Sequence, residues 1–295
     1  GINNTIMGGF AGDALTSGTN NVAIGRSALS TEDAHGYTVA VGTYALLNQN
    51  AGDNAFNTAV GYAAGENVTT GTFNTLIGGS AGDALTTGVR NVAIGKGALS
   101  AEDTGSYNVA IGESALTDQN VDNAYNVAVG YHSGLSVTTG TLNTIVGGEA
   151  GDALTTGSYN IAIGKSALST EDTGGASVAI GHAALFSQNY DGLAYNVAVG
   201  HNSGQLVTTG VSNTLIGGEA GDALTTGNNN IAIGYRALGA EDAHGNNVAI
   251  GTNALQSQNA GANAYNVAIG HNAGISVSTG VQNTILGGLA GDAIT

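Results

Sequence analysis

Hydrophobic and polar residues alternate along this chain in a short pattern that recurs seventeen times. One copy reads Asn21-Val22-Ala23-Ile24-Gly25. β-Branched residues that alternate with Ala predict a short β-strand, and a fixed Gly after a strand indicates a bend or a close backbone approach where no Cβ fits. The units begin at residues 4, 21, 38, 57, 74, 91, 108, 126, 143, 160, 177, 196, 213, 230, 247, 266 and 283.

Two further positions recur in each unit. The Gly that follows the strand is present in all seventeen units, and a small residue stands three positions after it. We interpret the small residue as the start of a second, inward-leaning strand that often ends in Leu, as at Leu29, Leu99 and Leu168. The structural positions singled out are Gly8, Gly25, Gly42, Gly61, Gly78, Gly95, Gly112, Gly130, Ala28, Ala98 and Ala167.

A strict period of 17–19 residues predicts an all-β parallel β-solenoid in which each unit is one turn. The units fall into four types that follow one another in a fixed order. We therefore expect a single elongated domain over residues 1–295, excised from a longer chain. It consists of the super-repeats 4–73, 74–142, 143–212 and 213–282 and a partial fifth, 283–295.

Composition removes several classes of function. The formal net charge of −16 repels nucleic acid and anionic lipid, so neither is an expected partner. The chain has no Cys, which excludes disulfides and thiolate metal sites, and no apolar stretch of membrane-spanning length. No Ser/His/Asp set or pair of carboxylates stands out from the repeat, so we expect neither an enzyme nor a cofactor.

A solenoid this thin is expected to associate with copies of itself. Each unit offers about three sizeable aliphatic side chains, worth about 2 kcal/mol each when buried. Ordering the backbone and side chains of a whole unit costs considerably more than that. Packing an apolar face against sister chains closes part of this gap, and we predict a homotrimer.

The repeat closely resembles the YadA-like head repeats of trimeric autotransporter adhesins, through its Val-Ala-Ile-Gly-x-x-Ala pattern. It is also similar to phage tail-fibre repeats, as in Asn57-Thr58-Ala59-Val60-Gly61-Tyr62. This resemblance implies a left-handed, trimeric β-roll that lies extracellularly, on a bacterial surface or a virion, and works in attachment. A glycan or protein receptor on a host surface would then be the partner.

Two other interpretations stay open. The first is an extracellular filament or matrix protein that polymerises end to end through open β-edges. The second is a hexapeptide-type acyltransferase, because Ile24-Gly25-Arg26-Ser27-Ala28-Leu29 resembles one hexapeptide of such enzymes. Those folds need three hexapeptides per turn, and only one is present here.

Acidic residues provide the candidate metal ligands. The segment Gly-Gly-x-Ala-Gly-Asp-Ala-Leu resembles a calcium-binding nonapeptide, although a turn-forming Asp is the alternative. Its aspartates recur once per super-repeat, as Asp13, Asp83, Asp152, Asp222 and Asp292. The second unit type carries a Glu-Asp pair and a nearby cation, such as Glu102-Asp103 with Lys96, which we interpret as a solvated ion-pair cluster.

Aromatic and histidine residues also recur. An aromatic residue precedes one unit of every super-repeat, and such a column either contacts a receptor or packs as a ladder over a solenoid edge. Its members are Phe56, Tyr125, Tyr195 and Tyr265. The histidines lack metal-ligand spacing and are expected to be structural or solvent-facing, unless a three-fold axis gathers copies of one around an ion. They are His35, His132, His182, His201, His244 and His271.

Overall fold

The computed structural model describes all residues from 1 to 295 and contains one three-residue strand in each of seventeen turns. It confirms the all-β parallel solenoid. The chain forms two compact units, Gly1–Asn143 and Thr144–Thr295, which are described separately. The expectation of a single domain stays a prediction. No helix is long and apolar enough to cross a bilayer.

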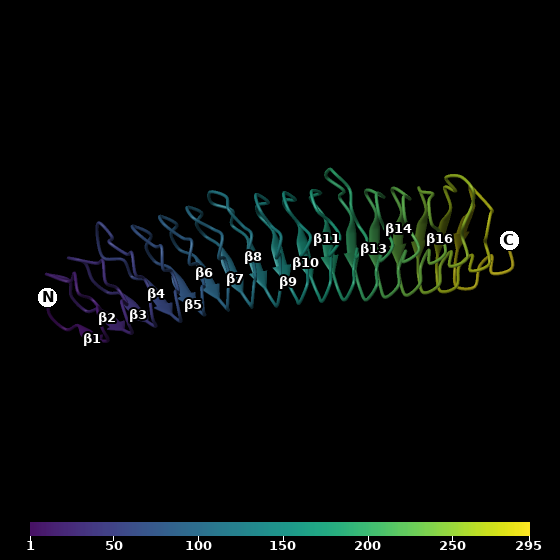
Figure 1. The fold of residues 1–295 in the computed structure, drawn as a ribbon. Coiled ribbons are helices and arrows are strands. Elements are labelled where there is room, and N and C mark those ends of the chain that lie inside the picture. Colours follow the sequence, from purple (N-terminus) through teal and green to yellow (C-terminus); the bar gives the residue numbers. More distant parts are fainter. The chain divides into compact units, whose positions relative to one another are not determined.

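Each unit is a stack of parallel strands in sequence order (Figure 1). The strands of the first unit are β1 (Thr5–Met7), β2 (Val22–Ile24), β3 (Val39–Val41), β4 (Thr58–Val60), β5 (Thr75–Ile77), β6 (Val92–Ile94), β7 (Val109–Ile111) and β8 (Val127–Val129). Those of the second are β9 (Thr144–Val146), β10 (Ile161–Ile163), β11 (Val178–Ile180), β12 (Val197–Val199), β13 (Thr214–Ile216), β14 (Ile231–Ile233), β15 (Val248–Ile250), β16 (Val267–Ile269) and β17 (Thr284–Leu286).

The register places equivalent residues of successive turns opposite one another. Val22 pairs with Val39, Ala23 with Ala40 and Ile24 with Val41. The glycine after the strand behaves as predicted. Gly25 has φ 127°, and a Cβ on it would lie 2.6 Å from the carbonyl carbon of Gly42 in the next turn. Only glycine fits this position, because both the backbone angle and the neighbouring turn exclude a side chain.

The predicted second strand is wrong. The segment after each glycine forms turns, because alternate residues take left-handed conformations: Ser27 has φ 54° and Leu29 has φ 52°. Its backbone nevertheless bonds to the turns on either side, as in Ser27 N–H to Gly9 O at 2.9 Å and Leu29 N–H to Ala45 O at 3.0 Å. The inward placement was correct, since Ala28, Ala98 and Ala167 are fully buried.

A ladder of buried asparagines runs along the inside of each unit. The Asn74 side chain accepts a hydrogen bond from the Asn91 backbone N–H (2.9 Å) through Oδ1 and donates to the Gly88 carbonyl (2.9 Å) through Nδ2. The same residue type performs this role in most turns, and Thr38 and Ser177 replace it in two. Most of these asparagines therefore satisfy a backbone N–H in the neighbouring turn and a carbonyl in their own, whereas the Asn108 Nδ2 has no hydrogen-bond partner.

The narrow interior selects the side chains that fill it. From β2 to β17 the middle strand residue is buried, and it is Ala in most turns. The flanking Val and Ile residues point outward and are partly exposed. In the turns with a central Ala, the larger aliphatic side chains of the strand are therefore on its outer face, which reverses the usual arrangement of a half-buried strand. Turns of the first type differ, since their central Leu76, Ile145 and Leu215 are fully buried.

Candidate functional site

The four Glu-Asp pairs do not form the solvated ion-pair clusters that were expected. Their glutamates, Glu32, Glu102, Glu171 and Glu241, are fully buried. The two lysine and arginine ion pairs of the structure lie elsewhere: Lys96 pairs with Glu113 at 3.8 Å and Arg236 with Glu219 at 2.6 Å. The glutamates are therefore interior residues, held by hydrogen bonds.

Backbone and amide groups surround each buried carboxylate. Glu102 accepts hydrogen bonds from the Gly105 N–H (2.7 Å), the Gln119 side chain (3.0 Å) and the Val121 N–H (3.3 Å). Glu171 is bound in the same way by Gly174 and Gln188. Burial raises the pKa of the Glu102 and Glu171 carboxyls, and these hydrogen bonds offset only part of the increase.

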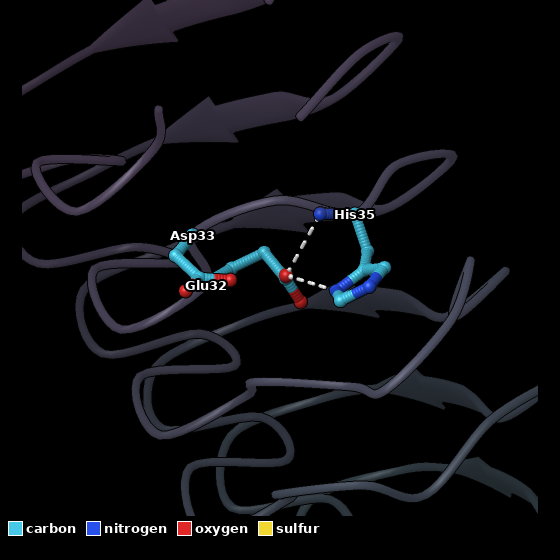
Figure 2. Close-up of side chains that lie close together, drawn as sticks. All are labelled: Glu32, Asp33 and His35. Atoms are coloured by element: carbon cyan, nitrogen blue, oxygen red, sulfur yellow. Dashed lines mark hydrogen bonds and ion pairs between the residues drawn. The ribbon is translucent and has the colours of Figure 1, made fainter. Parts of the chain in front are cut away.

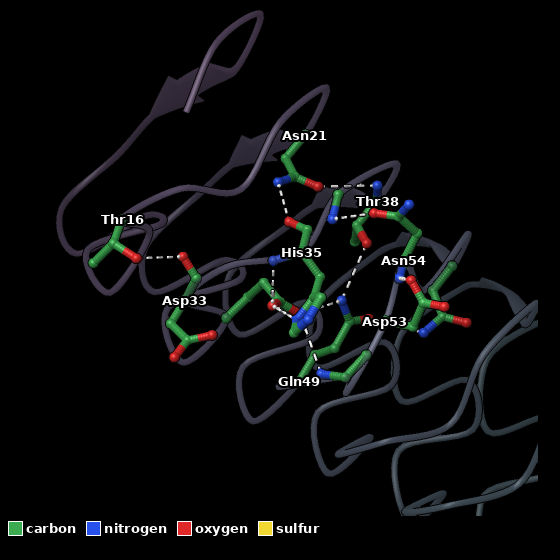
Figure 3. A network of polar contacts seen from close by, with 12 residues as sticks. Thr16, Asn21, Asp33, His35, Thr38, Gln49, Asp53 and Asn54 are labelled. Carbon is green, nitrogen blue, oxygen red and sulfur yellow. Dashed lines mark hydrogen bonds and ion pairs between the residues drawn. The ribbon is translucent and has the colours of Figure 1, made fainter.

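Two of the four glutamates also face a histidine. Figure 2 shows Glu32 with both the backbone N–H and the ring Nδ1 of His35 directed at its carboxylate, at 3.1 and 3.2 Å. Gln49 and the Ala51 N–H bind the other carboxylate oxygen, so this carboxylate belongs to the wider polar network of Figure 3. The equivalent residues in the fourth super-repeat are Glu241 and His244, whose nearest side-chain atoms are 3.3 Å apart.

The calcium candidates stay separate from these groups. Asp13 and Asp292 are exposed, whereas Asp83, Asp152 and Asp222 are partly buried. Asp152 accepts a hydrogen bond from Ser169 at 2.8 Å, as a turn residue would. Burial raises the pKa of the Asp83 and Asp222 carboxyls. None of the five lies in a group of three potential ligand side chains, so calcium binding there stays an untested prediction.

The remaining histidines make ring contacts. His132 stacks on Tyr131, and His182 stacks on His201 with their centroids 5.1 Å apart. A fourth, His271, is exposed at the start of its turn segment. These contacts are consistent with the structural or solvent-facing roles that the sequence indicated.

The aromatic column is a stacked ladder in the first unit. Tyr37 lies 5.2 Å from Phe56 and Phe56 lies 5.3 Å from Phe73, with nearly parallel rings in both pairs. The guanidinium of Arg90 covers Phe73 and Tyr107, and Tyr107 stacks on Tyr125. The rings therefore cover one another's faces and expose mainly their edges, which favours a packing role here over stacking on sugars.

In the second unit the same position carries isolated tyrosines. Tyr159, Tyr195 and Tyr265 are 61%, 58% and 55% exposed, because Ala176, Ser212 and Asn246 stand at the equivalent position of nearby turns. Beside the first of them is an open hollow of about 210 Å³, lined by Tyr159, Leu193, Thr156, Ser158 and Thr173. An uncovered ring beside hydroxyl groups is a surface that suits contact with a ligand.

All seventeen positions of this column have a positive φ, from Asn3 at 58° to Gln282 at 59°. Asn tolerates that conformation best among residues with a side chain, and it stands at four of the positions. Aromatic residues occupy most of the others, although the left-handed conformation disfavours them. Sequence reasoning identified the column but had no signal for this backbone strain.

A larger surface hollow, of about 520 Å³, surrounds the Arg236–Glu219 ion pair and includes Asp222 and Gly239. Other turns of this type carry Ser30, Ser100 or Ser169 where Gly239 stands. The hydroxyl that binds Asp152 through Ser169 is thus missing beside Asp222. This single replacement helps to open the hollow.

The outer face of the strands is the most extended candidate surface. The third strand residue is Val, Ile or Leu in sixteen of the seventeen turns and Met7 in the first, for example Ile94, Ile111 and Val129 in successive turns of the first unit. Each is partly or fully exposed. A scan against protein-family models and a search of curated proteins both give no match.

Proposed function

We propose that the chain is a non-enzymatic module of an extracellular attachment fibre, such as an adhesin head or a tail-fibre shaft. Its turns would coil with left-handed sense, and three copies would associate along the fibre. The observation that carries the proposal is the outward column of apolar strand residues that each of the two units presents. Contiguous exposed apolar surface marks an interaction site in soluble proteins.

Another copy of this chain is the binding partner that fits this face best. Parallel turns repeat at the same spacing in every copy, so one column of Val and Ile can interdigitate with another along its whole length. The column carries no charge, so it avoids the repulsion that the net charge of −16 creates elsewhere on the surface. Three thin solenoids would then share one apolar centre, in agreement with the resemblance to trimeric fibres.

The receptor contact is proposed for the isolated tyrosines of the second unit. Their uncovered rings, and the hydroxyl-lined hollow beside Tyr159, offer the chemistry that neutral glycans or receptor side chains require. Several such contacts on a trimer would bind a surface multivalently, so each can be weak.

Sedimentation and light scattering test the assembly. We expect a particle of three times the chain mass of 28.8 kDa. The triple variant Ile94→Lys, Ile111→Lys and Val129→Lys should dissociate it. A matched control, Ala101→Lys, Asn120→Lys and Thr139→Lys, changes exposed residues elsewhere in the same turns and should leave the trimer intact. A wild-type monomer would contradict the proposal, and indefinite filaments in electron micrographs would favour the polymerising alternative.

Binding of the wild-type trimer and of its Tyr159→Ala variant to immobilised neutral glycans tests attachment. Loss of binding in the variant is the expected result. Glycan binding that the variant retains would show that Tyr159 is not the contact residue.

A further inference from the structure

A four-residue segment, Glu-Asp-Ala-His, occurs twice in the chain, at 32–35 and 241–244. In both copies the structure gathers one potential ligand atom from each of the Glu, Asp and His side chains within 4.8 Å of one another. The carboxylate-to-Nδ1 separations of 3.2 and 3.3 Å match the spacing of about 3 Å between two ligands of one cation.

The copy in the fourth super-repeat contains atoms that lack partners. The Glu241 side chain is fully buried, yet its Oε2 has no hydrogen-bond partner. The Nε2 of Gln258 is unpaired as well, although its counterparts in the other super-repeats, Gln49, Gln119 and Gln188, donate to the equivalent oxygen. The buried Nδ1 of His244 faces the Glu241 carboxylate without a well-aligned hydrogen bond, and it too is unsatisfied. Leaving such groups unpaired is unfavourable, and a cation would satisfy the carboxylate and the imidazole together.

The other super-repeats show what this segment does without the histidine. Glu102 and Glu171 are buried in the same way, but Gly105 and Gly174 stand where His35 and His244 do. Their carboxylates are occupied by two backbone N–H groups and one Gln amide. A hydrogen-bonded glutamate therefore suffices to build the turn, and the turn does not require the histidine ring.

The first copy has the histidine, like the fourth super-repeat, but its glutamate has hydrogen-bond partners, like those of the second and third. Glu32 bonds to His35 (Figure 2) and also to Gln49 and Ala51, so both of its carboxylate oxygens have partners. A cation there would replace the Glu32–His35 contact and leave the Gln49 bond in place. Both histidines are partly exposed, at 28% and 27% of their side chains, which leaves room for water to complete a coordination sphere.

We propose that Glu241, Asp242 and His244 bind a divalent transition-metal cation such as Zn²⁺ or Co²⁺, and that Glu32, Asp33 and His35 form a second site of the same kind. One imidazole and two carboxylates are a donor set that these ions accept, whereas Ca²⁺ and Mg²⁺ prefer oxygen ligands alone. A dication also offsets the cost of burying the Glu241 carboxylate.

Calorimetric titration of the chelator-treated protein with Zn²⁺ tests the sites, and Co²⁺ absorption spectra report nitrogen and oxygen coordination. We expect two ions per chain. His244→Gln should remove one, and the double variant His35→Gln and His244→Gln should remove both. Circular dichroism would verify that each variant is folded.

The carboxylates provide a matched control. Asp242→Asn should weaken binding at its site by at least about tenfold. Asp172→Asn changes the equivalent residue in a turn without the histidine and should leave the stoichiometry unchanged. Absence of Zn²⁺ and Co²⁺ binding, or two ions still bound by the double histidine variant, would overturn the proposal. Neither result bears on the attachment-fibre proposal.

Discussion

The turns of a super-repeat fill one interior position in two different ways. In the first and fourth turn types this position holds an aliphatic residue, as at Leu85 and Val68. In the second and third types it holds Glu and then Gln, as at Glu102 and Gln119. All four side chains are fully buried. Each super-repeat therefore alternates two apolar turns with two polar turns, and this alternation is the physical basis of the four-turn period.

A second position changes together with the first. Three residues earlier, the apolar turns carry Gly and the polar turns carry Leu, as at Gly82 and Leu99. A Cβ on Gly82 would lie 2.9 Å from the Leu85 Cδ1, so the glycine makes room for the leucine. In the polar turns the leucine fills the space and the Glu or Gln reaches polar partners. Volume is conserved while the chemistry differs, which close packing requires.

Of the changes that test the two turn types, truncating the buried carboxylate of a polar turn should lower the free energy of unfolding most. Glu102→Ala removes the acceptor for three donors, at Gly105, Gln119 and Val121, and leaves a cavity. We expect a loss of about 3–5 kcal/mol in the free energy of unfolding, measured by urea denaturation, and faster amide exchange at Gly105. Asp103→Ala, beside it but partly exposed, should change stability by less than about 0.5 kcal/mol. Equal losses in the two variants would refute the interior role of Glu102.

Truncating the aliphatic counterpart should cost less. Leu85→Ala leaves a cavity but no unpaired polar group, so we expect a loss of about 2–4 kcal/mol. The exposed Thr87→Ala in the same turn is the matched control, with little change expected. Denaturation of both variants beside Glu102→Ala ranks the two turn types directly. A larger loss for Leu85→Ala than for Glu102→Ala would reverse the ranking.

A change of pH should produce the smallest effect on stability, and it should act on the polar turns and not on the apolar ones. Burial raises the pKa of Glu102 and Glu171 above the ordinary value of 4.5, so the folded protein holds their protons more tightly than the unfolded chain does. Their contribution to stability is complete below that ordinary value and is lost as the pH rises through the raised pKa.

The double variant Glu102→Gln and Glu171→Gln isolates this contribution from the rest of the acidic surface. Melting temperatures of both proteins between pH 4 and pH 7 should show the wild type losing stability relative to the variant as the pH rises. A difference that does not change with pH would contradict the assignment of buried, proton-holding carboxyls.

The strands, the glycines and the solenoid could be predicted because they depend on local periodicity. The second strand could not. Ala28-Leu29 has the composition of a strand, but the left-handed φ of Leu29 is set by the close contact of successive turns. The sequence also did not predict that Val22 and Ile24 point outward, because a period of two does not show which face of a strand is buried. The small Ala23 was the available signal, because Ala is the central strand residue in most turns and a small residue suits a narrow interior.

The buried glutamates were misread because charged pairs near cations are normally solvated. One signal was present. Counted from the strand, Glu32 and Glu102 occupy the position that Leu85 and Leu154 occupy in other turns. A charge in a column that is aliphatic in half of the turns indicates a buried carboxylate with a polar partner, and here that partner is the Gln at the same position of the next turn. The left-handed backbone at the aromatic column could not be predicted in this way, because Phe and Tyr disfavour that conformation and so do not indicate it in a sequence.

The asparagine ladder has a consequence for how such a gene can change. Each asparagine bonds only within its own turn and to the turn beside it, so no residue depends on a distant part of the chain. Deleting or duplicating one whole block of about 70 residues brings equivalent asparagines together at the junction and leaves every bond intact. Unequal recombination between blocks can thus lengthen or shorten the protein in single steps without an intermediate that fails to fold.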